Sequence, residues 1–227
     1  GGPRVEVIVK DILAQHEVAV GADGDLLVYR DGYFQPEKQF LAMEMTNRLG
    51  DDFRPAHVSA VEQFMIARLT ASGRVIMGVQ HPGLLNLANG MLDPMTGSLV
   101  AHDPKFLSTV RWTIAWQPES RAPMYEKWMA SQVGDQTDDL EEVTAAMLDT
   151  RRIPSKAILL YGPSRTGKST YERLMKSVAG QRNTSALTLH QLVNDRFAPA
   201  GLFGMVLNCA ADLSSRHIDD VSQFKAL

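Results

Sequence analysis

Cysteine is almost absent from this sequence. Cys209 is the single cysteine among 227 residues, so an internal disulfide is excluded and the chain suits a reducing compartment. No apolar run approaches the roughly 20 residues that a membrane-spanning helix needs, and the first residues show no signal-peptide pattern. We therefore expect a cytoplasmic protein that does not enter a membrane.

Metal-ligand spacings and repeats are also lacking. His57, His81 and His102 are scattered and have no cysteine or histidine partners at ligand spacing, so they predict no metal site. The sequence contains no internal repeat and no low-complexity tract. With 44% hydrophobic and 22% charged residues, the composition is that of an ordinary globular protein with one large or two small domains.

Charge is distributed unevenly along the chain. Residues 151–227 contain 11 Lys and Arg against 5 Asp and Glu, whereas residues 1–150 contain 12 against 21. A basic region suits contact with the phosphates of nucleotides or nucleic acids. A modest excess of this kind is also common in domains that bind no polyanion, so the charge alone leaves both interpretations open.

One stretch of the sequence predicts a specific chemistry. Residues 162–169, GPSRTGKS, fit the P-loop pattern G-x-x-x-x-G-K-[ST] at every fixed position. The apolar run 157–161 in front of it is typical of a buried strand, and residues 171–176 behind it favour a helix. A strand, a glycine-rich loop and a helix in this order predict a nucleoside-triphosphate site rather than a chance turn.

The residues of this loop have distinct expected roles. Backbone N–H groups at a helix N-terminus surround a polyphosphate, and Gly162 and Gly167 permit the tight path of the chain. Lys168 is predicted to reach the β- and γ-phosphates of ATP, and the hydroxyl of Ser169 is predicted to bind Mg²⁺. The predicted cofactor-binding residues are Gly162, Pro163, Ser164, Arg165, Thr166, Gly167, Lys168, Ser169 and Thr170.

An acidic motif is predicted downstream of the loop. Residues 204–209 form an apolar strand-like run that leads to Asp212, where an acid would hold the Mg²⁺ through water. Lys168 and Asp212 are therefore the predicted catalytic residues, and Ser169 and Asp212 are the predicted metal ligands. The alternative role for Asp212 is the N-cap of a helix that follows Ser214.

The remaining sequence predicts helices, a hairpin and short strands. Helices are expected at 4–20, 36–49, 58–69, 123–131, 138–148 and 190–194. Strands are expected at 26–29 and 33–34 around an Asp31-Gly32 turn, and at 84–87, 89–93, 96–100, 111–116, 184–189 and 204–209.

The predicted hairpin is rich in aromatic residues. Tyr29, Tyr33 and Phe34 lie on the two sides of its turn. Packing against the neighbouring helices is their expected role, and stacking on a nucleic-acid base is the alternative.

The order of several short motifs resembles a known family. The motifs are LLN at 84–86, NGMLD at 89–93, TG at 96–97, HDP at 102–104, Trp128, LLYGP at 159–163, GKST at 167–170, Asn194, RFAP at 196–199, Ile218 and SQFK at 222–225. Their order is similar to that in phage and plasmid members of the poxvirus-type primase-helicase family, which are superfamily 3 helicases of the AAA+ class. The resemblance covers about residues 80–227, and YRDGY at 29–33 fits the accessory region of that family.

The resemblance implies an architecture. The expected fold class is α/β, with a parallel P-loop NTPase sheet of the AAA+ type that is incomplete at the C-terminus and follows a mainly helical α+β region. The expected domains are an accessory helical region with a hairpin at 1–80, a helicase-associated N-terminal domain at 81–150 and the P-loop NTPase domain at 151–227.

The resemblance also implies a function. The expected activity is that of an ATP- and Mg²⁺-dependent DNA helicase in phage, prophage or plasmid replication. Such an enzyme translocates on single-stranded or forked DNA as a hexameric ring, with primase or other replication proteins as further partners, in the bacterial host cytoplasm. Two alternatives stay open: a non-catalytic nucleotide-binding or interaction module, and a small P-loop kinase.

The sequence departs from the family pattern in three places. Residues 164–166 replace a more glycine-rich loop interior, and Ala211 stands where many relatives have a second acid. The sequence stops at Leu227, before the family's third motif, sensor asparagine and arginine finger. We therefore expect a fragment, a partly ordered chain, or a protein whose missing strand comes from elsewhere, and no ATP hydrolysis by this chain alone. In the implied sheet, strands 157–161 and 204–209 are not neighbours.

Overall fold

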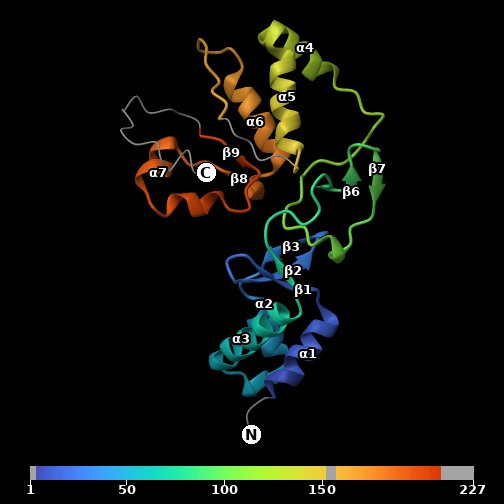
Figure 1. Cartoon of the computed structure of the whole chain (residues 1–227), viewed down its shortest axis with the longest axis vertical. Helices are drawn as coiled ribbons and strands as arrows, with labels where there is room; N and C mark the ends of the chain where they lie inside the picture. The colour runs from blue at the N-terminus through green and yellow to red at the C-terminus, as the bar shows by residue number, and fades with distance from the viewer. Residues whose placement is uncertain (1–3, 152–156, 211–227) are drawn as a thin grey trace. The chain divides into compact units, whose positions relative to one another are not determined.

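The computed structural model describes residues 4–151 and 157–210. The chain divides into two compact units, one formed by Gly1–Pro82 with Ala101–Val110 and the other by Gly83–Val100 with Arg111–Leu227 (Figure 1). The predicted division into three domains at residues 80 and 150 stays a prediction. In the described part of the chain, no helix has both the length and the apolar character that crossing a membrane requires.

The first unit packs helices against a sheet. Its helices are α1 (Val5–Gln15), α2 (Phe40–Leu49) and α3 (Pro55–Ala71), with 3₁₀ turns η1 (Gly50–Asp52) and η2 (Pro104–Phe106). Its strands are β1 (Val18–Gly21), β2 (Leu26–Arg30), β3 (Tyr33–Pro36) and β4 (Val75–Ile76). The strand order is β3-β2-β1-β4, with β1 antiparallel to β2 and parallel to β4.

Two predicted helices of this unit have wrong boundaries. The predicted helix 4–20 ends at Gln15, because residues 18–21 form β1, which is hydrogen-bonded between β2 and β4 and buried throughout. The predicted helix 36–49 begins only at Phe40, because Pro36 is the last residue of β3 and pairs with Leu27. The hairpin and the helix end at Gly50 are confirmed.

The sheet of the first unit is covered on both faces. Alternate residues of a strand point to opposite faces. Accordingly, Val18 and Val20 of β1 belong to the core that the helices form, whereas Ala19 belongs to a second cluster on the other face. Leu107, from the distant segment 101–110, packs against this second cluster.

The aromatic residues of the hairpin belong to the second cluster. Phe34 is buried there, and the Tyr29 ring lies 5.2 Å from its ring, centroid to centroid. The Phe34 N–H donates to the Ser108 carbonyl at 2.7 Å, which holds the 101–110 segment beside β3. Packing of Tyr29 and Phe34 against helices is therefore a wrong prediction, because the helices cover the opposite face of the sheet.

The second unit contains two small sheets and a layer of helices. Its strands are β5 (Leu85–Leu87), β6 (Gly90–Asp93), β7 (Ser98–Val100), β8 (Thr184–Ser185) and β9 (Leu207–Asn208). Its helices are α4 (Pro123–Gln132), α5 (Thr137–Leu148), α6 (Lys168–Ala179) and α7 (Leu189–Asn194), with 3₁₀ turns η3 (Gly134–Gln136), η4 (Gln181–Asn183) and η5 (Ala198–Leu202). The β5-β6-β7 sheet is antiparallel and confirms the three short strands expected between residues 84 and 100, and β8 and β9 are parallel.

The predicted strand 111–116 is wrong. The segment has no strand structure, although Trp112 N–H donates to the Asn86 carbonyl of β5 and Ala88 N–H donates to the Ile114 carbonyl, both at 2.8 Å. The Thr113 hydroxyl donates to the Ser177 carbonyl of α6 at 2.6 Å, which draws the chain toward that helix. The segment therefore joins β5 to α6 instead of extending the sheet.

The predicted strand 157–161 is also wrong in the described structure. The segment has no regular structure, and Ile158, Leu159 and Tyr161 are 56%, 64% and 94% exposed. A strand without a partner leaves its N–H and C=O groups unpaired, so apolar sequence alone does not form one. The Leu207–Asn208 strand pairs with β8. Because 157–161 is not a strand in the structure, the expected separation of these two segments within a sheet stays a prediction. The predicted P-loop sheet itself stays a prediction.

Candidate nucleotide-binding site

The loop 162–167 leads directly into α6. Gly162 and Gly167 have φ values of 155° and 85°, in the left-handed range that glycine tolerates best, and α6 begins at Lys168. Arg165 also has positive φ, at 64°, within the loop. The helix predicted after the loop is confirmed, and its N-terminus has N–H groups without intrahelical acceptors, as every helix does.

The Lys168 ammonium group folds back over the loop. Its Nζ donates to the carbonyls of Gly162 at 2.9 Å and Pro163 at 2.6 Å, and lies 3.3 Å from Thr166 Oγ1. The Thr166 hydroxyl also donates to the Pro163 carbonyl at 2.9 Å. These bonds place the positive charge inside the loop. A bound phosphate would replace the two carbonyl oxygens as the hydrogen-bond acceptor of Lys168 Nζ.

The other predicted site residues lie around this loop. Pro163, Ser164 and Arg165 are exposed, as are Ser169 and Thr170 in the first turn of α6. Asp212, the predicted catalytic acid and metal ligand, lies outside the described residues. Within the described ranges, no cluster of three His, Cys, Asp or Glu side chains could hold a metal ion. The structure thus brings 162–170 together but does not test Asp212.

Helix α6 is held at its N-terminal half by α5. The Tyr171 hydroxyl donates to the Leu140 carbonyl at 2.8 Å and lies 3.0 Å from the Thr144 hydroxyl (α5 and α6 in Figure 1). Burial raises the pKa of Tyr171, so the hydroxyl keeps the proton that it donates. These contacts fix the helix whose first turn ends the P-loop.

The C-terminal end of α6 is held by the 111–113 segment. Asn183 is buried, and its Nδ2 donates to the carbonyls of Ala179 at 2.7 Å and Arg111 at 2.9 Å. Trp112 packs with Ala179 in the core of the unit. Both ends of the P-loop helix therefore have fixed partners.

The end of β9 lies beside the same helix. Burial, followed by the nearby Glu172 carboxylate of α6, raises the pKa of the Cys209 thiol, whereas Lys176 acts in the opposite direction. Glu172 and Lys176 are themselves paired at 2.5 Å. The strand that leads to Asp212 thus ends alongside the P-loop helix.

Trp128 lies beside the end of the loop, and the sequence singles it out only through the family resemblance. It lies on α4, and a Cβ atom added to Gly167 would come within 3.1 Å of its Cζ2. The Tyr125 ring, one turn earlier, lies 6.4 Å from the Trp128 ring. No local signal in the sequence predicts this contact, because α4 and the loop are about forty residues apart.

Gly167 is therefore constrained twice, and Gly167→Ala is expected to destabilise the second unit by about 2 kcal/mol. Its positive φ is unfavourable for alanine, and the new methyl group would press on Trp128. Gly204→Ala is the matched control, because Gly204 has φ of 73° but nothing within 4 Å of an added Cβ. Urea unfolding followed by tryptophan fluorescence measures the free energy of unfolding of both variants. Equal losses for the two variants would show that Trp128 does not constrain Gly167.

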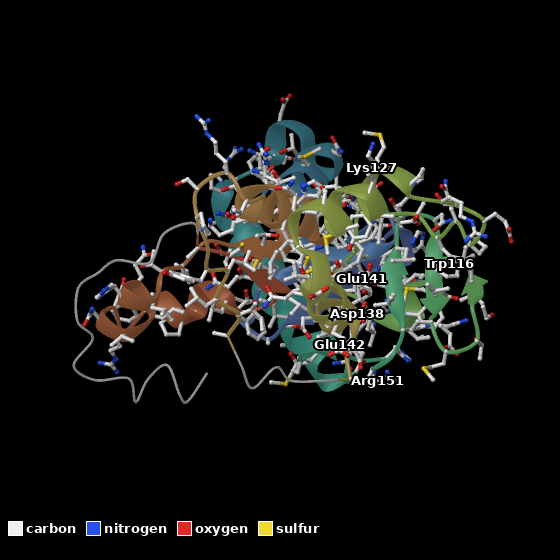
Figure 2. The ribbon with its side chains drawn as sticks, turned by 90° about the horizontal axis from the view of Figure 1, so that it is seen from above. Trp116, Lys127, Asp138, Glu141, Glu142 and Arg151 are labelled. Carbon is white, nitrogen blue, oxygen red and sulfur yellow. The ribbon has the colours of Figure 1, made fainter. Side chains whose placement is uncertain are left out.

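Charged groups near α5 reduce the basic character of this unit. Asp138, Glu141 and Glu142 are exposed on α5, which Figure 2 shows with Arg151. Arg151 makes a bidentate ion pair with Asp149: Nε donates to Oδ1 at 2.8 Å, and a terminal nitrogen donates to Oδ2 at 3.1 Å. The basic excess counted over 151–227 is thus partly neutralised by its neighbours.

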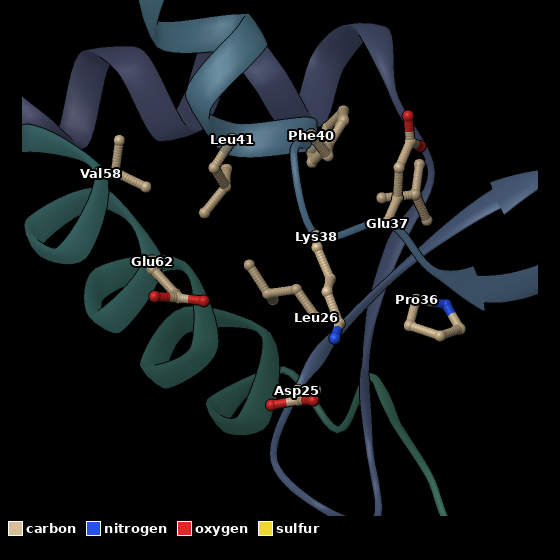
Figure 3. A pocket seen from close by; sticks show the side chains of 10 residues that line it. Asp25, Leu26, Pro36, Glu37, Lys38, Phe40, Leu41, Val58 and Glu62 are labelled. Carbon is tan, nitrogen blue, oxygen red and sulfur yellow. The ribbon is translucent and has the colours of Figure 1, made fainter. Parts of the chain in front are cut away.

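A hollow in the first unit is a poorer site for a nucleotide. Leu26, Phe40, Leu41 and Val58 are among the apolar residues that line it (Figure 3). Its charged lining is Lys38 with the three carboxylates Asp25, Glu37 and Glu62. An excess of negative charge repels a polyphosphate, so the P-loop is the better candidate.

Comparison with known families identifies the region in front of the P-loop. No curated protein matches the chain. Residues 28–134, just under half of the chain, match the family described as D5 N terminal like. The match begins in β2 and ends before α5, so it includes Trp128 but not the P-loop. Residues 28–134 are therefore similar to the N-terminal domain of D5-like phage and poxvirus primase-helicases, which relates this chain to proteins of phage DNA replication.

Proposed function

We propose that this chain is the nucleotide-binding part of an ATP-dependent DNA helicase that acts in phage-type replication. The observation that supports this most directly is Lys168, whose ammonium group lies inside a glycine-bounded loop at the start of α6. A primase-helicase-like region in front of such a loop is the second support. Neither feature favours a small kinase, which would need a compact acceptor pocket and a lid.

ATP and Mg²⁺ fit the donors of this loop. Backbone N–H groups and the Lys168 ammonium would bind the phosphates, and Ser169, in the first turn of α6, would give a hydroxyl to Mg²⁺. Mg²⁺ keeps most of its waters in sites of this kind, so it does not need a cage of protein carboxylates. Asp212 would complete the metal site through water.

In this proposal the chain binds single-stranded DNA and assembles with further copies of itself into a ring. We expect binding with little sequence preference and mainly through phosphates, so that the affinity falls about tenfold or more between 50 and 200 mM salt. Fluorescence anisotropy with a labelled oligothymidylate, with MgATP and at both salt concentrations, measures this. Light scattering on the same samples measures assembly.

A non-catalytic nucleotide-binding module is the second candidate. The exposed segment 157–161 favours it, because a P-loop outside a paired sheet has little support for turnover. A monomer that binds MgATP, does not bind DNA and shows no DNA-stimulated hydrolysis would establish this candidate and contradict the helicase. Salt-sensitive DNA binding together with ring assembly would support the helicase and contradict the non-catalytic module.

A further inference from the structure

Trp128 presents the N–H edge of its indole to the P-loop. The atoms nearest to an added Gly167 Cβ are Cζ2 at 3.1 Å, Cε2 at 3.6 Å and Nε1 at 3.6 Å, all on the nitrogen side of the ring. Gly167 is the residue before Lys168, so this edge lies beside the start of α6.

The indole N–H is a hydrogen-bond donor without a protein acceptor among the described residues. No described residue accepts a hydrogen bond from Trp128 Nε1. Apart from the bonds within α4, the backbone carbonyl of Trp128 accepts from Ser131 Oγ at 2.9 Å. Indole nitrogen can only donate, so its natural partner is an acceptor such as a phosphate oxygen. The positive end of α6 and the Lys168 ammonium beside it favour an anion as that acceptor.

The position of Trp128 is also well supported. The Tyr125 ring packs near it on α4, and burial, with the nearby Glu141 carboxylate and Tyr171, raises the pKa of Tyr125. Tyr171 belongs to α6 and bonds to α5, so the same group of helices positions both the loop and the indole.

We propose that Trp128 is a further nucleotide-contacting residue whose indole Nε1–H donates to a phosphate oxygen of a nucleoside triphosphate in the P-loop. This inference rests on the proposed function, since it uses the same site. It adds a contact from α4, inside the region that matches the primase-helicase N-terminal domain.

The first test uses the wild-type chain and the indole N–H resonances of its three tryptophans. MgATP is expected to move the Trp128 Hε1 resonance downfield and to leave that of Trp116 unchanged. Magnesium tripolyphosphate should reproduce the shift, whereas adenosine should not. A Trp128 resonance that responds to adenosine but not to tripolyphosphate would indicate base stacking and overturn the inference, as would no response to MgATP.

The second test measures affinity by calorimetry. Trp128→Phe keeps a packed ring but removes the N–H, and it is expected to weaken MgATP and magnesium tripolyphosphate about five- to tenfold. Trp116→Phe is the matched control and should change neither. If Lys168→Ala lowers the affinity by about 100-fold and Trp128→Phe leaves it unchanged, the inference is wrong but the proposed function stands. If Lys168→Ala leaves the affinity unchanged, the loop is not the nucleotide site, and the proposed function is contradicted whatever Trp128→Phe does.

Discussion

Lys168→Ala is expected to lower the affinity of this chain for MgATP by about 100-fold, because one or two charge-assisted bonds to phosphate, each about 1.5–3 kcal/mol, would be lost. In the structure, Lys168 Nζ already lies within the loop, against the Gly162 and Pro163 carbonyls. Isothermal titration calorimetry with MgATP measures the loss directly. No other lysine has this position in the described part of the chain.

The matched control for this variant is Lys176→Ala. Lys176 lies on the same helix and pairs with Glu172, so its removal changes the net charge equally without touching the loop. We expect its MgATP affinity to stay within about twofold of the wild-type value, because Lys176 lies about two turns after Lys168 on α6 and bonds to Glu172 rather than to the loop. A Lys168→Ala protein that binds MgATP as the wild type does would contradict the assignment of this loop as the nucleotide site.

Trp112→Ala is expected to destabilise the second unit by about 3–5 kcal/mol, the usual cost of removing a large buried side chain. Trp112 is only 1% exposed and packs with Leu85, Leu87 and Ala179, between the β5-β6-β7 sheet and the end of α6. Its removal would leave a cavity at the joint that holds the P-loop helix. A stability loss of this size is a large fraction of what a domain has.

Urea unfolding followed by tryptophan fluorescence measures this prediction. Trp112, Trp116 and Trp128 all lie in the second unit, so the signal follows that unit, and two reporters remain in each variant. Trp116→Ala is the control, because Trp116 is 36% exposed and should lose less than about 1 kcal/mol. If both variants unfold at the same urea concentration, Trp112 is not the core residue that the structure shows.

The sequence by itself determined those elements whose hydrogen bonds join residues that are close together in the chain. Residues 162–168 form a glycine-bounded loop followed by α6, because positive φ at two glycines and a helix start depend on neighbouring residues. The hairpin around Asp31-Gly32 and the β5-β6-β7 meander have the same character, with short turns that set the pairing of adjacent strands. These elements were predictable from spacing and turn residues alone.

Tertiary structure decided the features that depend on distant partners. The sequence predicts a helix through residue 20, but residues 18–21 form β1 because β2 and β4 supply its hydrogen bonds. Strand-like residues at 157–161 stayed exposed, because apolar sequence does not provide the partner strand that a backbone requires. The contact of Trp128 with Gly167 likewise follows from how α4, α5 and α6 pack, which no local pattern encodes.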